Sequence, residues 1–116
     1  MSTKFCKVFI VLMITCFIPN ISFSGDLILG KEIATTICST CHGIDGKATT
    51  GGNSAITPNI TAQQKDYLIA KLKDYRSGKI NHPQMSLIAQ MLSDEDIENV
   101  SEWYSKIKIS IELPSE

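Results

Sequence analysis

The chain has 116 residues, a length that fits one domain. Its balanced composition, with 43% apolar and 20% charged residues, excludes collagen-like, low-complexity and multi-span membrane proteins. Residues 25–116 carry nine Lys and Arg against twelve Asp and Glu, a net charge of −3. This charge argues against nucleic-acid binding, which needs a basic surface to neutralise phosphates.

Residues 1–24 have the pattern of a secretory signal peptide. Two lysines precede the mainly apolar run from Val8 to Ile18, and small residues stand just before Gly25. The apolar run is too short for a transmembrane helix, which needs about 20 residues. We therefore expect cleavage before Gly25 and export of residues 25–116 to the periplasm. An uncleaved leader that anchors the domain to the membrane is the alternative.

The first predicted helix covers about residues 26–40, with Asp26 as its N-cap. Three apolar residues recur at a spacing of four and predict a buried stripe: Leu29, Ile33 and Ile37. Gly30 lies inside this helix, where glycine is less favourable than alanine by about 1 kcal/mol. We expect a packing reason for it, such as another helix that crosses closely.

The second predicted helix covers residues 62–77. Thr61 and Gln64 have the spacing of a capping box at its start, and Gly78 is placed to end it. Its predicted inner stripe consists of Leu68, Leu72 and Tyr75.

A short helical turn is expected around residues 86–91, followed by a third long helix over residues 94–108. Ser93 is the predicted N-cap, and three acidic residues fill the first turn, where they complement the helix dipole. Its inner face is predicted to hold Ile97, Val100, Tyr104 and Ile107, with Trp103 at the edge. Strand patterns are poor, so the sequence predicts an all-α fold of three main helices plus a short helical turn. Residues 109–116 are expected to be a loose tail.

The motif Cys38-Ser39-Thr40-Cys41-His42 follows the first predicted helix. Two thiols three residues apart can bond the two vinyl groups of one haem, and the adjacent histidine can bind its iron, which is the c-type attachment pattern. The Gly-rich segment 43–60 is too long for an idle connection, and a porphyrin would fill the space that it encloses.

Three other interpretations of the motif are weaker. A disulfide between Cys38 and Cys41 would close a strained ring. A thioredoxin-like redox pair needs a preceding strand and a sheet, and neither is predicted. A zinc site needs a fourth ligand, for which His82 alone remains.

The sixth iron ligand has three candidates outside the leader. Met91 is expected in the core, because it is an apolar residue just before a helix cap. His82 precedes Pro83 and is expected to be a satisfied or solvated histidine in an exposed turn. Met85 lies just past that turn, which leaves its thioether free to point toward the haem.

From Gly30 to about Tyr104 the chain resembles a small bacterial class I cytochrome c. Besides the haem motif, the matching stretches include Pro58-Asn59-Ile60, Tyr67-Leu68 and the segment from Leu92 to Ile97. The resemblance implies that Cys38 and Cys41 form the thioethers and that His42 and Met85 bind the iron. It further implies that the Pro58 carbonyl accepts a hydrogen bond from His42, that Gly30 lies where the first and last helices cross, and that the haem is lined by Pro58, Ile60, Tyr67, Leu68 and Leu72.

The function implied is a periplasmic one-electron carrier with one covalent haem c, which meets redox partner proteins and has no small-molecule substrate. An electron-transfer subunit of a larger periplasmic oxidoreductase is the alternative, and a haem-based sensor or peroxidase-like enzyme is a weaker one. Basic residues of the second helix and acidic residues of the third either orient docking or form ordinary solvated faces.

Overall fold

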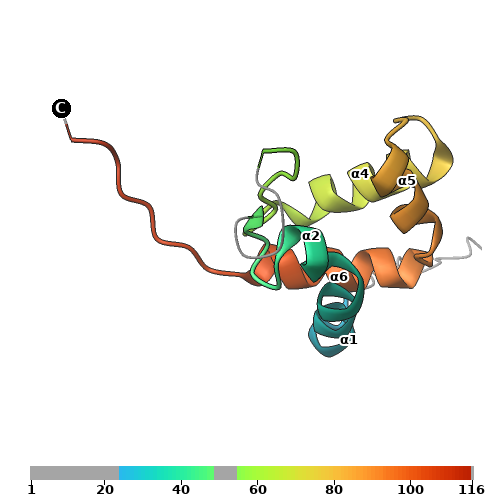
Figure 1. The fold of residues 1–116 in the computed structure, drawn as a ribbon. Coiled ribbons are helices and arrows are strands. Elements are labelled where there is room, and N and C mark those ends of the chain that lie inside the picture. The colour runs from blue at the N-terminus through green and yellow to red at the C-terminus, as the bar shows by residue number, and fades with distance from the viewer. Residues whose placement is uncertain (1–23, 49–54, 116) are drawn as a thin grey trace, which may run out of the picture.

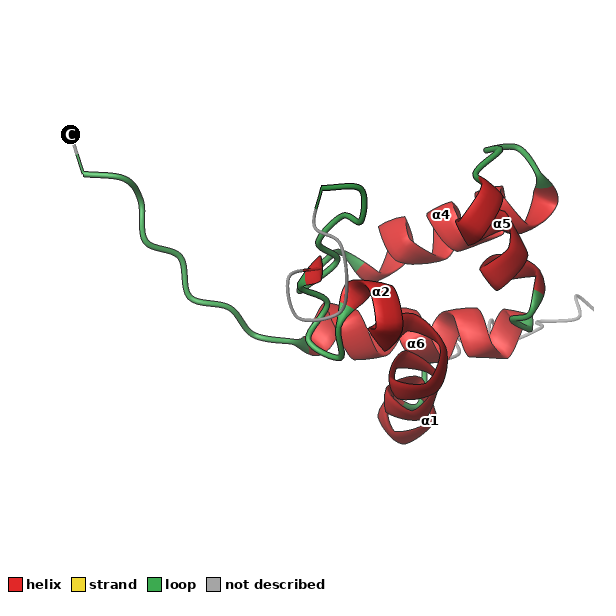
Figure 2. Cartoon of the chain, in the orientation of Figure 1, coloured by secondary structure: helices red, strands yellow, loops and turns green. Residues whose placement is uncertain are grey.

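The computed structural model describes residues 24–48 and 55–115, and every regular element in these two ranges is helical. Figure 1 shows the helices clustered together, and Figure 2 shows that the described segments between and after them are loops. The all-α prediction is therefore confirmed for this part of the chain. Residues 109–115 have no regular structure and run away from the helices (Figure 1).

The N-terminal helical segment consists of three consecutive pieces: α1 (Leu27–Ile33), the π-helical turn η1 (Ala34–Cys38) and α2 (Ser39–His42). Asp26 caps α1 as predicted, because its carboxylate accepts hydrogen bonds from two backbone N–H groups, at 2.7 and 3.0 Å. In η1 the threonine hydroxyls bond backwards to carbonyls four residues earlier, each at 2.8 Å. Such back-bonding bends helices.

The buried face of α1 differs from the predicted stripe. Leu29 is 43% exposed, whereas Gly30 and Ala34 are buried. The stripe prediction is right only in part: Ile33 and Ile37 are half-buried and Ile33 packs against the core, but Leu29 is exposed. At Gly30 the missing side chain lets the partner helix approach closely.

The partner is α6 (Asp94–Lys106), which crosses α1 at Gly30. A Cβ atom on Gly30 would lie 2.1 Å from the Asn99 carbonyl oxygen and 3.1 Å from the Trp103 Cβ. Real Cβ atoms do not approach so closely, so glycine is required. The expected packing reason for Gly30 is confirmed.

Helix α4 (Lys65–Ser77) begins three residues later than predicted. The predicted capping box does not form, because the Thr61 hydroxyl donates instead to the Asp45 carbonyl at 2.6 Å. Ala62 has a left-handed φ of 53°, and its N–H donates to the Tyr104 carbonyl at 3.0 Å. Tertiary bonds thus hold these residues outside the helix. Gly78, at φ 78°, ends α4 as predicted.

Helix α5 (Pro83–Gln90) begins earlier than the predicted turn, because His82 caps it and Pro83 supplies a favourable first residue. Helix α6 begins as predicted, with a full capping box between Ser93 and Asp96. It ends at Lys106, two residues before the predicted end.

Ion pairs join α4 to α6. Lys65 Nζ lies 2.9 Å from a carboxylate oxygen of Glu102 and 3.4 Å from one of Glu98. Arg76, near the other end of α4, pairs with Asp94 and donates to the Leu92 carbonyl at 3.1 Å. These basic residues thus serve the contact between helices rather than forming an uninterrupted charged face.

The core lies where η1, α4 and α6 meet. Its buried members are Ala34, Leu68, Val100 and Tyr104. Partly buried residues pack against them, and they include Cys38, Ile60 and Leu72. In residues 24–48 and 55–115 no helix has the length and apolar character to cross a bilayer.

Candidate haem-binding site

The motif residues lie at the junction of η1 and α2. Cys38 is the last residue of η1, and Cys41 and His42 lie on α2. Both cysteines are free thiols; Cys38 is half-buried and Cys41 is exposed. One helical turn therefore carries two free thiols, one half-buried and one exposed, next to a buried imidazole.

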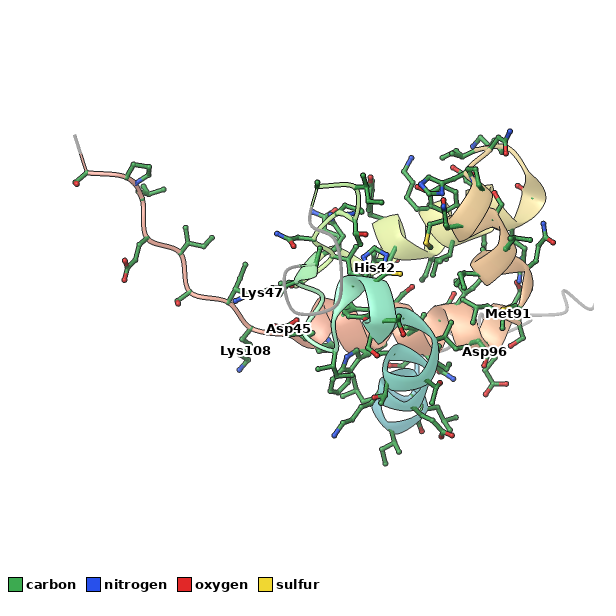
Figure 3. All side chains as sticks on the ribbon, viewed as in Figure 1. His42, Asp45, Lys47, Met91, Asp96 and Lys108 are labelled. Atoms are coloured by element: carbon green, nitrogen blue, oxygen red, sulfur yellow. The ribbon has the colours of Figure 1, made fainter. Side chains whose placement is uncertain are left out.

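His42 is 8% exposed and points inward from α2 (Figure 3). Its Nδ1 lies 3.0 Å from the carbonyl oxygen of Pro58. Because a carbonyl can only accept, Nδ1 must carry the proton, and the lone pair of Nε2 is left for a metal. Burial lowers the pKa of His42, and the bond to Pro58 opposes this only in part. The neutral imidazole is the form that binds iron.

The chain that leaves the motif is fixed by α6. Gly43 adopts φ 76°, and its carbonyl accepts a hydrogen bond from the Tyr104 hydroxyl at 3.0 Å. The indole N–H of Trp103 donates to the Ile44 carbonyl at 3.1 Å. The sequence predicted Tyr104 on the packing face and Trp103 at its edge, but it did not predict these hydrogen bonds. They could have been expected, because a Tyr hydroxyl or Trp N–H that is buried usually needs an acceptor.

Cys38 lies beside Tyr104 in the core. Burial, with a smaller contribution from Cys41, raises the pKa of the Cys38 thiol to about 11, although the Tyr104 hydroxyl opposes the shift. Burial also raises the pKa of Tyr104 well above its usual value. Both groups are therefore neutral at physiological pH, and they extend the apolar surface next to His42.

The predicted lining residues occupy different environments. Leu68 is buried, and Leu72 and Ile60 are half-buried in the cluster that contains Cys38. Tyr67 is largely exposed, and Lys71 Nζ lies 5.5 Å from its ring centre. Three of these apolar side chains thus lie with the motif, whereas Tyr67 faces outward.

The three candidates for the sixth ligand are distinguished by their surroundings. His82 Nδ1 accepts the Met85 N–H at 3.2 Å, and its ring packs edge-on against Tyr75. Met91 is 67% exposed at the end of α5 (Figure 3), so its expected core position was wrong. Met85 is half-buried within α5. Its thioether is the one among these ligands that is partly buried and not used as a cap.

The donor set fits a haem c. Two free thiols on one turn would supply the attachment points, and the free Nε2 of His42 would supply an iron ligand. The core cluster that contains Leu68 (the Leu68 cluster) would supply an apolar wall. Cysteine thiolates with a single histidine nearby are a poor match to the four ligands of a structural zinc site.

Comparison with known proteins agrees with this chemistry. The cytochrome c family model matches residues 27–108. Cytochrome c-554(548) of Halomonas halodenitrificans is 40% identical over 85 residues, which cover 71% of this chain and 96% of that protein. A thiosulfate dehydrogenase electron acceptor of Stutzerimonas stutzeri is 36% identical over 72 residues, which cover 62% of this chain and 32% of that protein.

Among solved structures, reduced recombinant cytochrome c4 from Pseudomonas stutzeri aligns with a TM-score of 0.64 and 26% identity. The alignment covers 75% of this chain and 48% of the cytochrome c4 chain. The chain thus spans nearly the whole Halomonas protein but less than half of these two longer proteins. On the family match, the motif and the helical fold, the chain belongs to the cytochrome c family, whose members transfer electrons with a covalently bound haem c.

Proposed function

We propose that this electron-transfer protein is a periplasmic carrier whose single haem c is bonded to Cys38 and Cys41 and ligated by His42 and Met85. The observation that carries the proposal is the buried His42, whose Nδ1 is fixed by Pro58 at 3.0 Å. When bound, haem iron exchanges one electron between its ferrous and ferric states. The secretory pattern of residues 1–24 supports the periplasmic location.

The protein contributes orientation, ligation and exclusion of water. Pro58 holds the imidazole of His42 in one tautomer and increases its basicity. The Met85 thioether would be the second iron ligand and would favour ferrous iron. With His42 and Met85 both bound to the iron, no ligand position would be left for a small-molecule substrate, so redox partner proteins are the expected reactants.

A subunit role in a larger periplasmic oxidoreductase is the second candidate. One relative is named as the electron acceptor of a thiosulfate dehydrogenase. Two large apolar side chains of this chain, Leu87 and Met91, are exposed at α5 and its end. Stable co-purification with a catalytic subunit would favour this candidate, whereas a monomeric, fully soluble holoprotein favours the free carrier.

The ligand assignment is tested by exporting the full chain from a cell with haem-maturation machinery. We expect haem staining on a denaturing gel and the absorption band of a methionine–iron bond. Met85→Ala should remove that band and admit carbon monoxide without denaturant. Met91→Ala and His82→Ala are the matched controls and should leave the spectrum unchanged.

Two results would contradict the proposal. A colourless exported chain would show that no haem is covalently attached. Loss of the methionine band in Met91→Ala, with the Met85→Ala spectrum unchanged, would transfer the axial role to the exposed sulfur.

A further inference from the structure

Gly25 packs tightly against the middle of α6. A Cβ atom on Gly25 would lie 2.6 Å from the Glu98 carbonyl oxygen and 2.8 Å from the Glu102 Cβ. Any larger residue would therefore have to displace the helix backbone. Ser24, one residue earlier, is exposed. Within the described residues, Gly25 thus makes a close contact with α6 that its exposed neighbour Ser24 does not share.

The neighbouring residue fixes this contact. The Asp26 N–H donates to the Asn99 side-chain oxygen at 2.7 Å, and Asn99 is 1% exposed. The Asp26 carboxylate is meanwhile occupied by the first N–H groups of α1. The partly buried hydrogen bond of Asp26 therefore holds the adjacent Gly25 against α6.

Gly25 lies against the backbone of Glu98 and the Cβ of Glu102, two residues whose carboxylates belong to an ion-pair network. Glu98 and Glu102 stand one helical turn apart on α6, and Glu102 is 7% exposed. Lys65 of α4 contacts both carboxylates, and the well-exposed Lys106 lies 3.4 Å from Glu102. The hydrogen bond from Lys65 lowers the pKa of Glu102, so this carboxylate is ionised at neutral pH.

We propose that signal peptidase hydrolyses the peptide bond between Ser24 and Gly25 and that the new α-ammonium group of Gly25 joins the ion-pair network of Glu98, Glu102 and Lys65. One water is consumed; the leader leaves with the Ser24 carboxylate, and the mature chain begins with a protonated amine. Small residues at positions 22 and 24 match the preference of the peptidase. Processing then completes a structural contact as well as releasing the protein.

The first test is the intact mass of the exported holoprotein. We expect one covalent haem on a chain that begins at Gly25. A retained leader, or a mature chain that begins at another residue, would overturn the proposal. The mass identifies the N-terminus whatever the axial ligands are, so this outcome is independent of the proposed haem ligation.

The second test is the pKa of the Gly25 α-amine, followed by NMR of the ¹³C-methylated mature protein. Nearby carboxylates should raise it above the ordinary range of about 7.7–8.0. Glu98→Gln, which leaves the Lys65–Glu102 pair intact, should lower it, and Glu98→Gln with Glu102→Gln should return it to that range. Glu95→Gln, an exposed change in the first turn of the same helix, is the control and should have no effect.

The sign of the pH dependence follows. A group with a raised pKa in the folded state stabilises the fold below its unfolded pKa, and this contribution is lost as the pH rises through the folded pKa. The mature protein should therefore lose stability above about pH 8, and the double variant should lose less. The proposed contact would be disproved by an α-amine pKa in the ordinary range, or by an α-amine pKa that does not change when both glutamates are replaced.

Discussion

The two nitrogens of His42 have separate tasks. Nδ1 is bound to the Pro58 carbonyl, and the lone pair of Nε2 is left for a metal. His82 shows the contrast: its Nδ1 accepts the Met85 N–H and caps α5. The sequence alone indicated that His42 is the ligand, because it completes the five-residue motif. It could not show that His82 is used as a cap, since that depends on a side-chain rotamer.

Replacing Gly30 tests the helix crossing. In an ordinary helix position, alanine is more favourable than glycine by about 1 kcal/mol. Here a Cβ meets the Asn99 carbonyl at 2.1 Å, so Gly30→Ala should instead destabilise the protein by about 1–3 kcal/mol. Guanidinium unfolding measures the change. Ala70→Gly on the exposed face of α4 is the control and should show the ordinary direction. A Gly30→Ala protein as stable as wild type would refute the crossing.

The helices were predictable to the extent that local patterns decide them. Ser93 and Asp96 form a local capping box, and the start of α6 was correctly predicted. Thr61 and Gln64 have a similar spacing, but Thr61 bonds to Asp45, 16 residues away. Long-range bonds of this kind are not visible in a local pattern. The π turn η1 is a different case, because the threonine bonds found in it are local, to carbonyls four residues earlier, and this local signal was not used in predicting the first helix.

The ion pair between Arg76 of α4 and Asp94 at the start of α6 predicts that the stability of the fold depends on pH in the acid range. The hydrogen bond from Arg76 holds the pKa of Asp94 below its usual value. A lowered folded pKa stabilises the fold above the unfolded value of about 3.9. This contribution is lost as the pH falls through the folded pKa.

Asp94→Asn should therefore lower the stability at neutral pH modestly, because the pair is exposed, and should flatten the decline of stability below about pH 4. Urea unfolding from pH 7 to 2.5 measures both effects. Glu95→Gln removes a neighbouring charge without a described ion pair and should keep the acid-range decline. An unchanged pH profile in Asp94→Asn would contradict the assignment.

At the scale of the whole molecule, the apolar core is small. The described ranges contain eight buried apolar residues, and three of them are alanines: Ala34, Ala48 and Ala89. A core of this size is marginal for a domain of this length. A porphyrin bonded next to the Leu68 cluster would add apolar surface where η1, α4 and α6 converge.

Removing both attachment points tests this dependence. Cys38→Ala with Cys41→Ala should give a chain without covalent haem and with a melting temperature at least about 10 °C lower, which corresponds to ~2 kcal/mol for a domain of this size. Thermal unfolding followed by far-UV circular dichroism measures it. The control is the exposed Met91→Ala. A double variant that melts like wild type would show that the polypeptide is sufficient for the fold.

The π-helical turn between Gly30 and Cys38 sets the azimuth of the haem cysteines about the helix axis. A π turn holds one residue more than an α turn, and one residue in an α-helix corresponds to a rotation of about 100°. Deleting Thr35 or Thr36 would turn the π turn into an α turn that completes the same rotation with one residue fewer, so both thiols would keep their azimuth. Inserting one alanine after Thr36 would instead add a residue that the π turn does not absorb and would rotate both thiols by about 100°, although Gly30 would still meet α6. The aim of the sulfurs and the anchoring of the helix are therefore separately adjustable, and the insertion should misdirect haem attachment without touching either cysteine, whereas the deletion should not.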